Sequence, residues 1–269
     1  MGISLVAATL GAGIACAPFE RTSRRGDVRT VSRCEASRAV VDFDPEGALA
    51  TSEQVAFTEL VDRGIGDLER VLLVSPPIEP RSGRRIRFVV SPRVAMSRTF
   101  GRTVLLPLTR VRDRRAPYLH ETVHALVPTS NRSSWLTEGL ACYLESWTAE
   151  NVSGYDAHVF TRAGDRTIHQ AAARYLLTNT GRAVLPWIGA PGQPPGLSED
   201  RNSVARPFYV LSHSFTKYLV ESLGLSAVAG LASTPDPERE LARLSGREAS
   251  RWREEWLAGR AAGSRAPGD

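Results

Sequence analysis

The stretch HETVH at residues 120–124, followed by WLTEGLA at residues 135–141, decides what this chain can fold into. Side chains four positions apart share one face of a helix, so His120 and His124 point the same way. A second helix opening on the second motif would bring the carboxylate of Glu138 to the two imidazoles. Two histidines and one carboxylate form a three-ligand zinc site whose fourth position stays open, as in a catalytic zinc.

The residues around the first motif set the limits of its helix. Pro117 suits a first-turn position, and Pro128 cannot continue a helix. Ser133 or Ser134 can cap the helix that follows. Within the first helix, Glu121 lies between the two histidines, beside the open coordination position. It is therefore the natural base for a water molecule bound there.

Patterns on both sides of the motifs predict an α+β fold. Apolar periodicity and punctuation by Gly and Pro predict helices at residues 48–73, 168–177, 208–223, 227–231 and 238–257. Alternating and apolar runs predict strands at residues 85–90 and 102–108. A strand just ahead of an HExxH helix suits a sheet whose edge lines a substrate cleft, where an extended peptide could add as another strand.

The charge of the chain comes almost entirely from arginine. There are 34 basic residues, Lys217 is the single lysine, and the formal net charge is +5. Arginine clusters could contact phosphate. However, the arginines are spread along the chain, are mixed with carboxylates, and accompany no nucleic-acid motif, so we interpret them as a solvated basic surface with no nucleic-acid partner. The alternative is a basic nucleic-acid-binding protein with an accidental HExxH.

The N-terminus is typical of an export signal. Residues 1–17 hold a short apolar run and a small-x-small triplet that ends at Ala15, after which a signal peptidase could cut. In a bacterium, Cys16 could instead become the lipid-modified first residue of a lipoprotein attached to a membrane. We expect an exported protein, either secreted, periplasmic or held at the cell envelope. The alternatives are a buried N-terminal helix and a start codon assigned too far downstream.

The domain boundaries follow from this signal. We expect a polar linker at residues 18–35, one domain at 36–258 and a disordered tail at 259–269. With Cys16 removed or acylated, Cys34 and Cys142 remain as an even pair, and a disulfide between them is possible in an oxidising compartment. Cys142 could equally be a small buried residue on the Glu138 helix.

Over about residues 85–257 the chain resembles the gluzincin-type zinc metallopeptidases, specifically the bacterial peptidase MA-like domain family. The resemblance rests on HExxH, on WLxEGLA, on a later YxxSxSFxxYL helix from Tyr209 to Leu219, and on a closing helix with Trp252 or Trp256. It implies a zincin-like α+β fold, in which a small N-terminal sheet packs on the HExxH helix and a mainly helical C-terminal half follows.

The resemblance also implies roles for single residues. His120, His124 and Glu138 would bind Zn²⁺, and Glu121 would be the general base in hydrolysis of a peptide bond in a peptide or protein substrate. A donor to the tetrahedral oxyanion is needed as well. We expect Tyr209 in this role, with His213 one turn later as the other candidate.

Two points stay open. Tyr209 could be a packing residue and His213 a hydrogen-bonded bystander, in which case the protein could be a catalytically silent, zinc-holding binding or envelope protein on the same scaffold. Many gluzincins also carry an acidic residue one turn after the zinc-binding glutamate, where it orients a ligand histidine. Cys142 stands at that position here, and Glu145 could reach in from the next turn.

Overall fold

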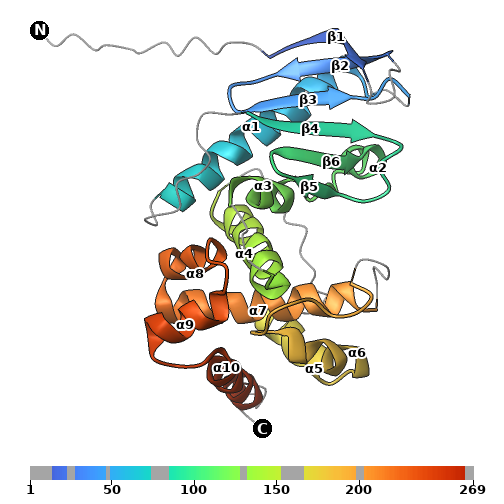
Figure 1. Cartoon of the computed structure of the whole chain (residues 1–269). Coiled ribbons are helices and arrows are strands. Elements are labelled where there is room, and N and C mark those ends of the chain that lie inside the picture. The colour runs from blue at the N-terminus through green and yellow to red at the C-terminus, as the bar shows by residue number, and fades with distance from the viewer. Residues whose placement is uncertain are drawn as a thin grey trace, which may run out of the picture.

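The computed structural model describes residues 14–22, 28–46, 49–73, 85–127, 132–152, 167–197 and 203–263. A mixed β-sheet forms one end of the molecule, helices α5 to α10 form the other, and α3 and α4 lie between them (Figure 1). The strands are β1 (Ala15–Thr22), β2 (Val28–Glu35), β3 (Ala39–Phe43), β4 (Ile86–Ser91), β5 (Arg98–Phe100) and β6 (Thr103–Pro107). They lie in the order β1-β2-β3-β4-β6-β5, and β4 is parallel to β3 and to β6 while the other neighbours are antiparallel.

Helices form most of the rest of the described chain. They are α1 (Thr51–Leu73), α2 (Leu108–Arg112), α3 (Tyr118–Leu126), α4 (Ser134–Asn151), α5 (Ile168–Leu176), α6 (Asn179–Val184), the 3₁₀ turn η1 (Leu185–Trp187), α7 (Ala205–Leu223), α8 (Leu225–Ala232), α9 (Pro237–Ser245) and α10 (Ala249–Gly263). None of the helices within these residues is long and apolar enough to cross a membrane.

Helix α1 connects the parallel strands β3 and β4 and packs on the sheet. Val61, Ile65, Leu68 and Leu72 are buried along it. Their spacing of three or four residues makes one apolar face that covers the strands, which is how an amphipathic helix is stabilised. The same packing brings α1 against α3, so the sheet is the platform on which the first motif helix lies.

The helices and strands predicted around the motifs are confirmed. The segments at 85–90 and 102–108 form β4 and β6, and the helix expected at 48–73 is α1. The single helix expected at 238–257 is divided into α9 and α10, and α10 continues to Gly263, into the segment expected to be a disordered tail from residue 259. Gly246 causes the division, because it adopts a left-handed conformation with φ of 68° at the end of α9.

The segment expected to be a polar linker, residues 18–35, instead forms most of β1 and all of β2. These strands were missed because their polar residues hide the alternation of a half-covered sheet; in β2, Val31 and Cys34 are buried while Glu35 is exposed. The folded unit therefore begins well before residue 36. The linker prediction is wrong, because a pair of strands with few apolar side chains occupies this segment.

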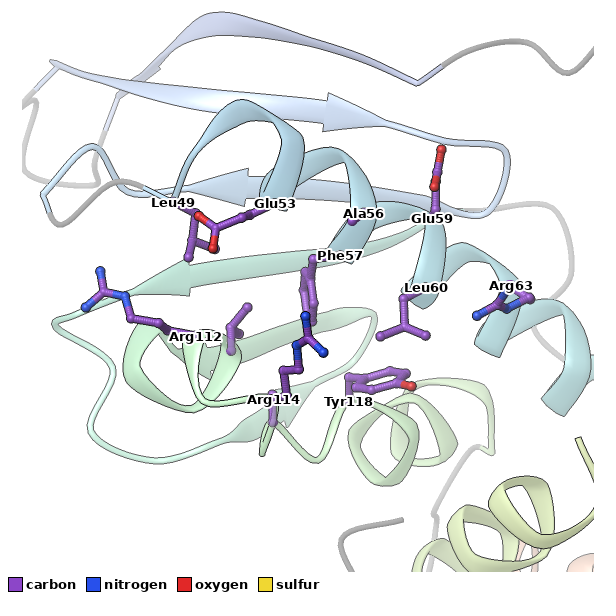
Figure 2. Close-up of a pocket in the computed structure, with 12 residues that line it drawn as sticks. Leu49, Glu53, Ala56, Phe57, Glu59, Leu60, Arg63, Arg112, Arg114 and Tyr118 are labelled. Atoms are coloured by element: carbon purple, nitrogen blue, oxygen red, sulfur yellow. The ribbon is translucent and has the colours of Figure 1, made fainter. Parts of the chain in front are cut away.

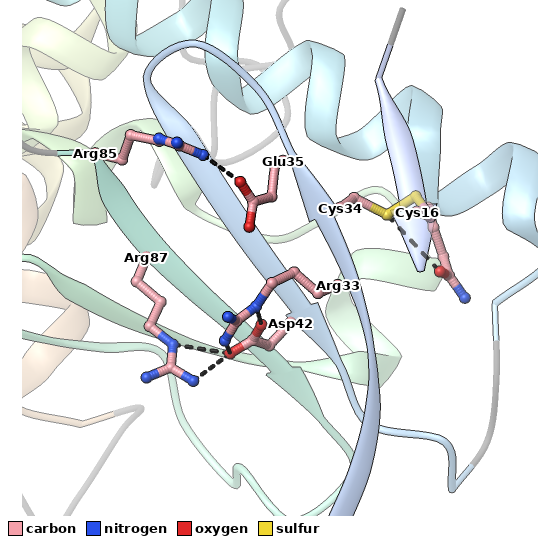
Figure 3. A network of polar contacts seen from close by, with 8 residues as sticks. Cys16, Arg33, Cys34, Glu35, Asp42, Arg85 and Arg87 are labelled. Atoms are coloured by element: carbon pink, nitrogen blue, oxygen red, sulfur yellow. Dashed lines mark hydrogen bonds and ion pairs between the residues drawn. A yellow bond between two sulfur atoms is a disulfide. The ribbon is translucent and has the colours of Figure 1, made fainter. Parts of the chain in front are cut away.

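The cysteine pairing also differs from the expectation. Cys16 on β1 lies opposite Cys34 on β2 and forms a disulfide with it (Figure 3), whereas Cys142 is free and buried. A bond between Cys34 and Cys142 is thus excluded in this structure, and the sulfur of Cys16 cannot carry a lipid thioether while it is bonded to Cys34. Residues 1–13 hold most of the expected signal and lie outside the described residues, so export stays a prediction. Residues 264–269, the end of the expected tail, also lie outside them.

A buried carboxylate connects three strands of the sheet (Figure 3). Asp42 on β3 accepts a hydrogen bond of 2.7 Å from Nε of Arg33 on β2 and one of 2.8 Å from Nε of Arg87 on β4. Its side chain is 1% exposed, so the two guanidinium groups supply nearly all of its solvation. The pair of arginines therefore fastens β2, β3 and β4 across the ladder.

Candidate metal centre

Helices α3 and α4 carry the two motifs. α3 begins after Pro117 and ends at Leu126, as its flanking prolines predict, and Leu119 and Val123 are buried in the core beneath it. α4 begins at Ser134 after the N-cap residue Ser133. The side chain of Ser133 is not used for capping; it donates instead to Glu238 of α9.

The three predicted metal ligands meet. Nε2 of His120 lies 3.1 Å from Oε2 of Glu138 and 3.1 Å from Nε2 of His124, and Nε2 of His124 lies 3.5 Å from the same Glu138 oxygen. Donor atoms bound at 2.0–2.2 Å to a tetrahedral zinc lie about 3.3–3.6 Å from one another. The three side chains therefore fit a zinc ion, and no other group of three such residues lies close enough in the part of the chain that the structure describes.

The charges of these groups lead to the same conclusion. Burial opposes ionisation of Glu138, but His124 and His120 outweigh it and hold the pKa of Glu138 well below its usual range. Burial likewise opposes protonation of His120, yet Cys142 and Glu138 raise the pKa of His120 well above its usual value. A carboxylate that faces two imidazole nitrogens favours a positive charge at this position, and a protonated imidazole or a metal ion can supply it.

A cavity of about 510 Å³ opens on this cluster. His120, Glu121, His124 and Glu138 line it, and so do Arg98 and Thr99 of strand β5. β5 is the last strand of the sheet order, so in the described residues its outer side pairs with no other strand. A sheet edge thus lies at the cavity, but it is β5; the predicted strand at residues 102–108 is β6, which lies inside the sheet between β4 and β5.

Glu121 lies in the cavity beside the ligands and is buried, with 6% of its surface exposed. Its carboxylate Oε2 accepts a hydrogen bond of 2.7 Å from the hydroxyl of Thr99 on β5. The prediction that Glu121 faces the same space as the three ligands agrees with this position.

The two candidate oxyanion donors lie in different surroundings. Tyr209 lines the cavity, with its ring centroid 6.1 Å from that of His120. The negative charge of Glu138, followed by burial, raises the pKa of Tyr209, so its phenol keeps its proton and can donate. His213 is buried, packs against Tyr143, and is not among the cavity-lining residues.

Cys142 occupies the position that often holds an acidic residue. Its sulfur lies 3.7 Å from Nδ1 of His120, the ring nitrogen that does not face Glu138. A sulfur at this distance can accept a weak hydrogen bond when Nδ1 carries the ring proton, and this tautomer keeps the other nitrogen of the ring free for a metal. Glu145, one turn farther along α4, is buried rather than exposed.

Sequence reasoning missed Thr99, because the three-residue strand β5 was not predicted. The signal was present: Gly101 and Arg102 separate two short β-prone runs, and Phe100 pairs with Thr103 across them. A two-residue loop that starts with Gly is typical of a β-hairpin, and Gly101 has a φ of 58° here.

A second hollow, of about 380 Å³, lies between α1 and the segment that joins α2 to α3 (Figure 2). Phe57 and Tyr118 form part of its wall, and Arg63, Arg112 and Arg114 surround it. None of the candidate ligands lines it, so this hollow is separate from the candidate metal centre.

Comparisons with known proteins give a fold likeness and no family. No protein-family model matches the chain, and no curated protein matches its sequence. Among solved structures, the chain is similar to a mutant M1 zinc metallopeptidase from Deinococcus radiodurans bound to a Tyr-Ser-Ala substrate, with a TM-score of 0.48 and 14% identity. The match covers 92% of this chain but 52% of that enzyme, about half its length. A likeness at this level does not define a function, which must follow from the side chains of the chain itself.

Proposed function

We propose that this protein is a zinc-dependent peptidase of the gluzincin type, which hydrolyses peptide bonds in a peptide or protein substrate. One observation carries the proposal: Nε2 of His120, Nε2 of His124 and Oε2 of Glu138 converge within 3.1–3.5 Å, in a cavity that also holds Glu121. Ligands and base thus share one space that a substrate can enter. A purely structural zinc site would have four protein ligands and would need no base beside it.

The donor set favours zinc over magnesium and calcium. Two imidazoles and one carboxylate suit zinc, whereas magnesium and calcium prefer oxygen ligands alone. When bound, zinc would supply Lewis acidity to a water molecule and to the substrate carbonyl. The chain would hold the ion with His120, His124 and Glu138.

The remaining roles belong to the residues of the cavity. Glu121 would take a proton from the attacking water and return it to the leaving amine. Tyr209, with its phenol protonated, would donate a hydrogen bond to the oxyanion. The outer edge of β5 would bind an extended substrate segment as an added strand.

The disulfide between Cys16 and Cys34 supports an exported protein, since such bonds persist in oxidising compartments. With cleavage after Ala15, Cys16 would become the first residue of the mature chain and could keep this bond. Attachment through a lipid on Cys16 would require the bond to be absent. Mass spectrometry of the mature protein, with and without reduction, distinguishes the two forms.

The proposal is tested by metal analysis and by cleavage of a peptide library, with and without a chelator. The wild-type protein should bind one zinc per chain and lose activity when the metal is removed. Glu121→Gln should keep the zinc and lower kcat by about 100- to 10,000-fold, because only the base is lost. His124→Ala should lose both zinc and activity.

Other outcomes would identify the alternatives. Zinc bound by the wild type with no cleavage of any peptide would point to a silent, zinc-holding binding protein. Absence of stoichiometric zinc, together with salt-dependent retention on DNA, would point to a nucleic-acid-binding protein instead.

A further inference from the structure

Thr99 contacts Glu121 twice. Its hydroxyl oxygen lies 2.7 Å from Oε2 of the Glu121 side chain and 3.0 Å from the backbone carbonyl oxygen of the same residue. A carboxylate has no proton to give, so the hydroxyl donates, and its single proton favours the shorter, charge-assisted contact. The Thr99 hydroxyl therefore holds the carboxylate of Glu121, and the backbone carbonyl oxygen is the weaker of its two acceptors.

The position of Thr99 is itself fixed by the sheet. Its Cα pairs with that of Val104 on β6, which is buried, and β6 is in turn paired with β4. As a β-branched residue, threonine has few rotamers available on a strand. Thr99 is also half-buried, between exposed Arg98 and exposed Phe100, which fits a strand that turns this one side chain toward α3.

Resting on the peptidase function proposed above, we infer that Thr99 is a positioning residue for the base Glu121. Its hydroxyl holds Oε2, so Oε1 is the oxygen that takes the proton from the attacking water and later passes it to the leaving nitrogen. Without the hydroxyl, the Glu121 side chain gains rotamers in which neither oxygen faces the water. Because Thr99 belongs to β5, the strand that would bind substrate also sets the orientation of the base.

A purely structural role is the competing explanation. Thr99 could matter only because it fastens β5 to α3 through the Glu121 carbonyl, or because its methyl group fills space. Three variants separate these roles. Thr99→Val keeps the shape and removes the hydroxyl, Thr99→Ser keeps the hydroxyl and removes the methyl, and Thr99→Ala removes both. Thr103→Val on β6 is the matched control, since it makes the same change on the neighbouring strand at a residue that does not line the cavity.

Kinetics with a cleaved library peptide give the first readout. Thr99→Val and Thr99→Ala should lower kcat about tenfold or more and leave KM within about twofold, because orientation of the base acts on the chemical step. Thr99→Ser should recover most of the kcat, and Thr103→Val should match the wild type. Bound zinc should stay at one per chain in every variant. The inference is wrong if Thr99→Val keeps full kcat, or if Thr99→Ser loses as much as Thr99→Val.

Crystal structures of the zinc-loaded proteins give a second readout that needs no activity. Glu121 should have one ordered rotamer in the wild type and in Thr99→Ser, and a displaced or divided one in Thr99→Val and Thr99→Ala. An unmoved Glu121 in those two variants overturns the inference even if the protein is an active peptidase. A displaced Glu121 in a protein that cleaves nothing would support the contact while refuting the proposed function.

Discussion

Gly139 on α4 lies directly against the backbone of Ser212 on α7. A Cβ atom at residue 139 would be 2.6 Å from the Ser212 carbonyl oxygen and would also collide with the Thr216 hydroxyl. Only glycine allows two helices to approach this closely. Since Gly139 follows Glu138 and Ser212 lies one turn after Tyr209, the contact sets the distance between a metal ligand and the proposed oxyanion donor.

Replacing Gly139 should therefore damage both packing and site. We expect Gly139→Ala to lower the free energy of unfolding by about 1–3 kcal/mol, because the helices must separate to admit the methyl group. Zinc affinity and kcat should fall with it. Chemical denaturation and chelator competition measure these effects.

Gly230 on α8 provides the control, because a Cβ there would meet nothing within 4 Å. Gly230→Ala should be neutral or stabilising by about 0.5–1 kcal/mol, since alanine favours a helix interior. Equal effects of the two substitutions would show that the close contact of α4 and α7 is not what matters at residue 139.

The two candidate oxyanion donors predict different kinetics. Tyr209→Phe should lower kcat by about 100- to 1,000-fold with little change in KM, because the donated hydrogen bond strengthens only in the transition state. His213 is buried away from the cavity lining, and burial, aided by Lys217 and His169, lowers the pKa of His213 to about 3. It is a neutral packing residue at pH 7.

His213→Gln should consequently leave kcat within a few-fold of the wild type, even where stability drops. Steady-state kinetics at matched folded fractions, established by circular dichroism, make the comparison. A larger loss of kcat in His213→Gln than in Tyr209→Phe would exchange the two roles.

Cys142 should influence how tightly the site holds zinc. Its sulfur is 3.7 Å from Nδ1 of His120, and removing the partner of a ligand histidine typically lowers metal affinity by about 10- to 100-fold. Because sulfur is a weak acceptor, we expect Cys142→Ala to lower zinc affinity by about tenfold, at the lower end of this range. Competition with a fluorescent chelator measures it. An unchanged affinity would mean that His120 is oriented by packing alone.

The candidate site could be predicted from the sequence because the residues that form it lie close together along the chain. The spacing of the two histidines and the two flanking prolines define α3, and the packing of the next helix, α4, against α3 brings Glu138 to the histidines. Periodicity could not reveal Thr99, whose sequence signal is the Gly101-Arg102 turn. The contact of Thr99 with Glu121 depends on a three-residue strand and a two-residue turn, which are too short to give a periodic pattern.

The sheet was harder to predict for a related reason. β1 and β2 carry arginine, serine and threonine where a covered strand would carry apolar residues, so their hydropathy resembles that of a linker. What stabilises them is pairing across the sheet, as between Arg33 and Asp42, and the disulfide of Cys16 with Cys34. Such contacts join residues that no local pattern connects.

Asp42 gives a prediction about the dependence of stability on pH. Burial opposes its ionisation, but hydrogen bonds from Arg33 and Arg87 outweigh this, and the pKa of Asp42 lies below its ordinary value of 3.8. A carboxyl with a depressed pKa in the folded state adds stability at pH values above the unfolded pKa, and that stability is lost as the pH falls through the folded pKa. We therefore expect the free energy of unfolding to fall on acidification below about pH 4, with Asp42 among its causes.

Asp42→Asn isolates this contribution. At pH 7 it should lower the free energy of unfolding by about 2 kcal/mol or more, since two partly buried guanidinium groups lose their counter-charge. Between pH 5 and pH 3 it should lose less stability than the wild type, because it has no proton to bind at this position. Glu46→Gln, which breaks the exposed pair with Arg93, is the control and should change stability by less than about 1 kcal/mol. Urea unfolding at several pH values measures both curves, and parallel curves for wild type and Asp42→Asn would show that Asp42 keeps an ordinary pKa in the folded sheet.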